Sequence, residues 1–119
     1  MADATTVPLN RGRLAALRAL QTADEPNVVR RVIDLFLQEM PNRMGRLADA
    51  VSRDERPTIA REAHGIRGAA GTIGAEAVFR AAGDLENAAN NDAPADFMRL
   101  AAVVRHALDV ARAQLLLER

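Results

Sequence analysis

Hydrophobic residues recur along most of this chain at the three- and four-residue spacing that one side of an α-helix requires. The longest series steps by 4, 3, 4, 4, 3 and 4 positions and consists of Val29, Ile33, Phe36, Met40, Met44, Leu47 and Val51. It predicts one long helix over about residues 27–53. Val28, Val32 and Leu35 add a second apolar flank, so we expect this helix to have neighbours on two sides.

A proline, Pro41, lies inside this series. Proline lacks an amide hydrogen and clashes with the carbonyl four residues before it, here that of Leu37. Because the apolar series continues beyond the proline, we expect the helix to bend between these two residues rather than to stop.

The same spacing predicts three more long helices and one short one. The short helix covers about residues 11–21, and the long ones cover about residues 57–74, 75–90 and 94–117. Pro57 suits the first turn of a helix, and Gly74 suits a left-handed C-cap. Four long helices joined by short breaks predict an all-α fold. We expect an antiparallel four-helix bundle with a short accessory N-terminal helix over residues 11–119, preceded by a flexible lead of residues 1–10.

The composition favours packed helices and excludes several classes of protein. Hydrophobic residues make up 49% and aromatic residues only 3%, whereas strands rely on aromatic and β-branched residues. There is no cysteine for a disulfide or a thiolate metal site, and the formal net charge of zero argues against a broad nucleic-acid surface. No apolar run approaches the roughly 20 residues of a membrane span, and the N-terminus lacks the apolar core of a secretory signal.

These observations favour a cytoplasmic monomer that binds neither nucleic acid nor a membrane. The initiating methionine and the short ends favour a free-standing protein, although a piece of a larger sensor kinase stays open. All sixteen basic residues are arginines.

One stretch, AHGIRGAAGTIGA at residues 63–75, holds one of the two histidines and four of the seven glycines. At about 100° per residue, the apolar residues of this helix cluster on one side. They are Ile59, Ala63, Ile66, Ala70 and Ile73. His64 falls roughly 150° from the centre of that cluster, so it is predicted to face water. A surface histidine without a role is the alternative.

Two glycines surround this histidine on the helical wheel. Gly68 and Gly71 lie within about 40° and 20° of it, and Ala60 shares that side. Each glycine in a helix interior costs about 1 kcal/mol relative to alanine. Close helix packing would explain glycines that face the core, but these two face away from it. The low-bulk surface predicts docking of another protein, with apolar contacts from Leu14 and Leu17 of the first helix.

Arg67, three residues after His64, can reach the same space. Its planar, permanently charged guanidinium suits a phosphoryl group, and a neutral imidazole is a nucleophile at neutral pH. The alternative for Arg67 is a solvated surface arginine, which is common in a chain so rich in arginine.

The stretch AHGIRGAAGTIGA resembles the motif of the histidine-phosphotransfer (HPt) domain family, an Ala-His-x-Leu-Lys-Gly core followed by small residues and Gly-Ala. The segment VIDLFLQEMPNRMGRLADAV resembles the long helix before the family's histidine, and GDLENAA resembles the Leu-Glu segment after it. Together these matches cover most of residues 12–90. The chain departs from the motif in having Ile66 for leucine, Arg67 for lysine, and Gly65 where a larger or polar residue is more usual.

The resemblance implies a helical bundle that relays phosphoryl groups between aspartates of receiver domains. By position, His64 would be phosphorylated, Arg67 would hold the phosphoryl group, and Gly68 would leave room for it. Response-regulator receivers would be the partners, with a hybrid sensor histidine kinase as a further candidate. The resemblance implies no cofactor of its own, since the receiver brings Mg²⁺.

Two other functions stay open. One is the phosphoacceptor domain of a chemotaxis-type histidine kinase, whose donor is ATP on a kinase domain. The other is a helical docking module without phosphotransfer. The sequence has no P-loop, so no autonomous kinase activity is expected. Neither histidine, His64 or His106, has a second ligand at a helical metal spacing, so the sequence gives no sign of a zinc site.

Overall fold

The computed structural model describes residues 7–119, and these form five helices and no strand. The helices are α1 (Arg11–Arg18), α2 (Val28–Ser52), α3 (Arg56–Ile73), α4 (Glu76–Ala89) and α5 (Phe97–Leu116). The all-α prediction is therefore confirmed. The helix ends differ from the predicted ones by up to three residues, at the end of α1 and at the start of α5. Helix α5 begins after the N-cap Asp96, whose side chain accepts a hydrogen bond from the amide of Arg99.

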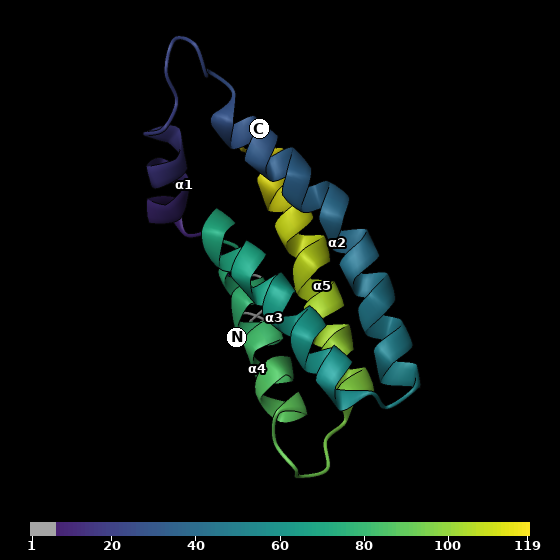
Figure 1. Ribbon diagram of the computed structural model, residues 1–119. Coiled ribbons are helices and arrows are strands. Elements are labelled where there is room, and N and C mark those ends of the chain that lie inside the picture. The colour runs from purple at the N-terminus through teal and green to yellow at the C-terminus, as the bar shows by residue number, and fades with distance from the viewer. Residues whose placement is uncertain (1–6) are drawn as a thin grey trace.

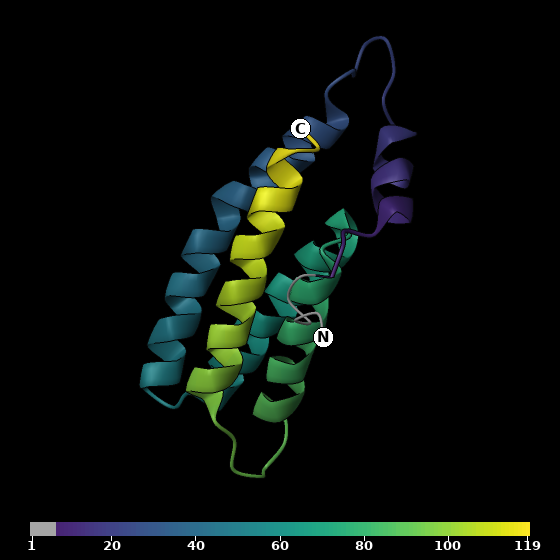
Figure 2. The same ribbon diagram turned by 180° about the vertical axis from the view of Figure 1, so that it is seen from behind.

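Helices α2 to α5 form a four-helix bundle in which each helix contacts two of the others (Figure 1). The contacting pairs are α2 with α3, α3 with α4, α4 with α5, and α5 with α2. Figure 2 shows α5 between α2 and α4. The short helix α1 lies beside one end of the bundle, against α2 and α3. The accessory position predicted for the first helix is thus the one that it occupies.

The long helix α2 continues without a break through Pro41. Six of the seven residues in its predicted apolar series are buried, and Ala50 takes the last buried place while Val51 is half-buried. The second flank is less covered than predicted, because Leu35 is 57% exposed. A bend at Pro41 stays a prediction.

The turn between α3 and α4 anchors the N-terminal part of the described chain. Gly74 has a left-handed φ of 83° and caps α3, as the sequence predicts. Its carbonyl accepts a hydrogen bond of 2.7 Å from the amide of Asn10, whose side chain caps α1. Leu9 is buried in the core. The flexible lead predicted for residues 1–10 therefore does not extend to Leu9 and Asn10, and residues 1–6 lie outside the described part of the chain.

Ion pairs attach the two ends of the described chain to each other. Glu118 pairs with Arg11 and Arg18 of α1, the latter at 2.9 Å. Arg119 pairs with Asp34 of α2 at 2.7 Å. The hydrogen bonds from Arg18 and then Arg11 hold the pKa of the Glu118 carboxyl below its usual value. The C-terminal residues thus help to fix α1 and α2.

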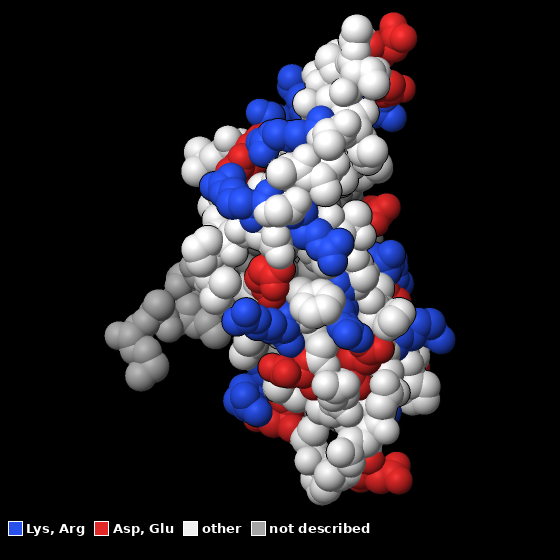
Figure 3. Space-filling model, turned by 90° about the vertical axis from the view of Figure 1, so that its left-hand side faces the viewer, with Lys and Arg blue, Asp and Glu red and all other residues white. Residues whose placement is uncertain are grey.

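Basic and acidic side chains are interspersed over the face that Figure 3 shows, so that face presents no broad basic field. None of the described helices is long and apolar enough to cross a membrane.

Candidate functional site

Helix α3 presents its polar side between α2 and α4. Pro57 occupies its first turn. Its core side is buried as the wheel predicts, through Ile59, Ala63, Ile66, Ala70 and Ile73. His64 points to water, with 71% of its side chain exposed, so the predicted orientation of this histidine is confirmed.

The imidazole of His64 is held by a carboxylate from the neighbouring helix. Its Nδ1 lies 2.8 Å from Oε2 of Glu86 on α4. The side chain of Glu86 is only 15% exposed, because the preceding residue, Leu85, is fully buried and keeps this part of α4 against the bundle. An ionised carboxylate can only accept, so the bond places the proton of a neutral imidazole on Nδ1. Nε2, at the other side of the ring, then carries the lone pair.

Arg67 is held by the same carboxylate. Its Nη1 donates to Oε1 of Glu86 at 3.2 Å. Its guanidinium carbon lies 4.9 Å from the centroid of the Phe79 ring, a cation–π distance. The aliphatic part of Arg67 passes over Gly83 of α4, where a Cβ would lie 3.7 Å from it. Arg67 is therefore a positioned side chain, which argues against a freely solvated arginine.

The glycines around His64 differ in what lies next to them, as the contacts of an added Cβ show. A Cβ on Gly68 would meet nothing within 4 Å, so this position is open to an approaching partner. A Cβ on Gly71 would lie 3.3 Å from the Phe79 ring. The small size of Gly71 thus accommodates Phe79, and its place in a docking surface stays a prediction. Gly65 faces α2 and leaves room for the guanidinium of Arg43.

The apolar docking contacts predicted from α1 need correction. Leu14 is fully buried, because the single apolar side of this short helix faces the bundle. Its side chain is therefore not available to a partner. Leu17 is half-buried and packs against the core, and Ala60 is half-buried on α3.

Two residues of the site were not predicted as such, Glu86 and Phe79. The only sequence signal for Glu86 is its place directly after the apolar residue Leu85 in the segment GDLENAA. That place puts it at the edge of the buried side of α4. Which residue of α3 it would meet depends on the register between two helices, and periodicity within one helix does not determine that register.

No group of three potential metal ligands occurs among residues 7–119. His106 is exposed on α5, which contacts α2 and α4 but is not one of the two helices that build the site around His64.

No curated protein and no solved structure matches this chain. A family model, described as the Hpt domain, matches residues 31–114, which is more than two thirds of the 119 residues. The match spans the site around His64 and Glu86. Hpt domains act in histidine phosphotransfer in two-component systems, where they interact with response-regulator receivers and kinases. The chain belongs to the Hpt domain family.

Proposed function

We propose that this protein is a phosphorelay intermediate in which His64 accepts a phosphoryl group from the aspartate of one receiver domain and passes it to another. The observation that carries the proposal is the exposed imidazole whose Nδ1 is held by Glu86 at 2.8 Å. This bond leaves Nε2 without a hydrogen bond among the described residues. A nucleophile oriented by a neighbouring group in this way is typical of covalent catalysis.

In the proposed step, the lone pair on Nε2 attacks the phosphorus of the receiver's aspartyl phosphate. The N–P bond forms, the bond from phosphorus to the carboxyl oxygen breaks, and the aspartate leaves as a carboxylate. The imidazole keeps its proton on Nδ1 and gains positive charge as the bond forms. The carboxylate of Glu86 stabilises that charge where it develops. Transfer to the second receiver is the reverse step with a new aspartate.

Arg67 has a supporting role in this proposal. In the unphosphorylated protein, its charge is balanced by Glu86, with which it shares one hydrogen bond. An incoming phosphoryl group adds negative charge, and the guanidinium has further N–H groups with which to bind its oxygens. The stacking on Phe79 keeps Arg67 beside the site while it does so. We expect Mg²⁺ to come with the receiver.

The shape around His64 favours a protein as the phosphoryl donor. Small-molecule sites are concave, whereas His64 stands out from a helix, and the Gly68 position beside it is open. A receiver could therefore bring its aspartate close to the imidazole.

The test is incubation with a radiolabelled phosphorylated receiver and, separately, with a histidine-kinase core and labelled ATP. Label from the receiver that is absent in His64→Gln and present in His106→Gln supports the proposal. Label from the kinase core alone would assign the protein to the chemotaxis-type phosphoacceptors instead. Label from neither donor would leave a docking module.

A further inference from the structure

An apolar groove runs between α2 and α5, on the side of the bundle opposite to α3 and α4. It consists of two hollows, of about 300 and 250 Å³, which share Met44 and Arg105. Together they extend from Phe36 to Ser52 on α2 and from Met98 to Arg112 on α5. At 1.5 Å per residue, these walls are about 24 and 21 Å long. That length matches a helix of about fourteen to sixteen residues.

The lining of this α2–α5 groove is apolar and adaptable. Every methionine within residues 7–119 contributes to it, namely Met40, Met44 and Met98. Methionine is enriched at surfaces that bind amphipathic helices, because its side chain adapts to different partners. Met98 is 77% exposed. Gly45 and Ala48 on the α2 wall are small residues, so an apolar side chain of a partner can enter the groove beside them.

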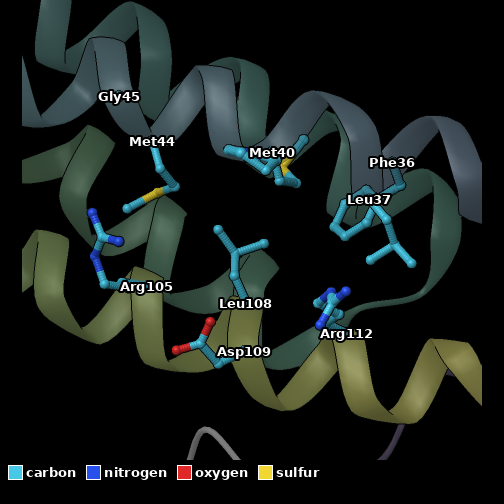
Figure 4. Close-up of a pocket in the computed structure, with 10 residues that line it drawn as sticks. Phe36, Leu37, Met40, Met44, Gly45, Arg105, Leu108, Asp109 and Arg112 are labelled. Carbon is cyan, nitrogen blue, oxygen red and sulfur yellow. The ribbon is translucent and has the colours of Figure 1, made fainter.

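Among the described residues that line the groove, charged side chains occur only on α5. Arg105 and Arg112 stand seven residues, or two turns, apart, with Asp109 between them. Figure 4 shows Arg105 beside Met44 at one end, Arg112 near Leu37 at the other, and Leu108 between them. None of these charged residues forms an ion pair with another described residue. The edge therefore has a net charge of +1 and two guanidiniums available for an acidic partner.

We propose that the α2–α5 groove binds an amphipathic helix of a partner protein whose apolar side is edged by two acidic residues seven positions apart. The acidic residues would face Arg105 and Arg112, and a neutral or basic residue would face Asp109. The apolar residues between them would enter the hollows beside Leu108 and Met44. Both walls are helices, so the groove offers no sheet edge for an added strand. A second copy of the chain would bring an equally positive edge against this one.

The α2–α5 groove and the site around His64 lie on different pairs of helices, so a partner in the groove would not cover His64. His64 and Glu86 lie on α3 and α4, and the groove is formed by the other two helices of the bundle. A partner helix could therefore remain bound while a receiver approaches His64. Such binding would attach the phosphotransfer domain to another protein without blocking transfer.

The test uses a synthetic helical peptide of about sixteen residues, with leucines on one side, two glutamates seven positions apart at its edge, and a lysine between them. Its control is the charge-swapped peptide, in which each glutamate is lysine and the lysine is glutamate. Methyl signals of labelled methionines report on the groove directly. We expect the acidic peptide to shift the Met44 and Met98 signals saturably and to bind at least about fivefold more tightly than the control at low salt.

Two protein variants locate the binding. Gly45→Gln adds bulk to the α2 wall at a position where a Cβ meets nothing within 4 Å, so the variant folds and should lose the peptide while retaining phosphotransfer. The double variant Arg105→Glu, Arg112→Glu should prefer the charge-swapped peptide. Gly68→Gln, on the opposite side, should bind the peptide like the wild type.

Four results would overturn the proposal. These are the absence of a saturable shift, shifts confined to the surface around His64, unchanged binding by Gly45→Gln, and a wild-type dimer in sedimentation that Gly45→Gln dissociates. The last result would assign the groove to a second copy of the chain.

Discussion

The two glycines with open surroundings, Gly68 on α3 and Gly45 on α2, form a matched pair for mutation. Both lie inside a helix, and a Cβ at either position meets nothing within 4 Å. Glutamine at each site should therefore fit without strain. Replacing an interior helical glycine raises the free energy of unfolding by about 0.5–1 kcal/mol. The unfolding entropy of 119 residues is about 250 cal/mol/K near the midpoint, so Tm should rise by about 2–4 °C in both variants.

The functional effects of the two substitutions should differ. Gly68→Gln places a long side chain one helical turn from His64, in the space that a receiver must enter. Raising the activation free energy by about 1.4 kcal/mol slows transfer tenfold, and we expect Gly68→Gln to raise it by at least that amount. Gly45→Gln should transfer at the wild-type rate.

Thermal unfolding followed by circular dichroism gives Tm, and label transfer from a phosphorylated receiver gives the rate. A Gly68→Gln variant that transfers as fast as wild type would refute the argument that the open glycine serves receiver approach. A lower Tm in either variant would refute the packing on which the argument depends.

Three further predictions follow from particular contacts. Gly74→Ala should lower the free energy of unfolding by about 1–3 kcal/mol in denaturant titrations, because φ is 83° and the new Cβ would lie 2.9 Å from the Asn10 carbonyl oxygen. The hydrogen bonds from Arg18 and then Arg11 lower the pKa of Glu118 below its usual value of 4.5. The ionised carboxylate therefore stabilises the folded protein at pH values above 4.5, and this stabilisation is lost as the pH falls below that value. Hydrogen exchange should show faster opening of α1 in acid, with a flatter pH dependence in Glu118→Gln. Glu86→Ala should slow transfer from a receiver about tenfold. Glu86→Gln should slow it less, because the glutamine amide oxygen can still accept a hydrogen bond from Nδ1 of His64. Equal transfer rates in the wild type and both variants would contradict the orienting role of Glu86.

The periodic apolar series predicted the helices and most of the core, because burial of one side is what an amphipathic helix requires. The same reasoning failed where a neighbouring element decides the outcome. Leu35 belongs to an apolar flank of α2 and is nevertheless 57% exposed. Leu14 was expected to meet a partner and is instead buried. A helical wheel gives the apolar side of a helix but not what covers that side.

The site was predictable to a similar extent. The phase of α3 determined that His64 faces water and that Gly68 is beside it, since both follow from positions within one helix. The contact between His64 and Glu86 joins residues 22 positions apart on two helices. It depends on the register of α4 against α3, which arises from the packing of Leu85 and its neighbours. Sequence periodicity therefore could not supply the residue that orients the nucleophile.

In the proposed mechanism, His64 accepts the phosphoryl group on Nε2, because Glu86 holds Nδ1. The most direct measurement is a long-range proton–nitrogen NMR spectrum of the imidazoles in protein phosphorylated by a receiver. We expect an acid-labile phosphohistidine at residue 64, with phosphorus coupled to Nε2 and the proton on Nδ1. Phosphorus on Nδ1 of His64, or a phosphohistidine at His106 with His64 unchanged, would contradict it.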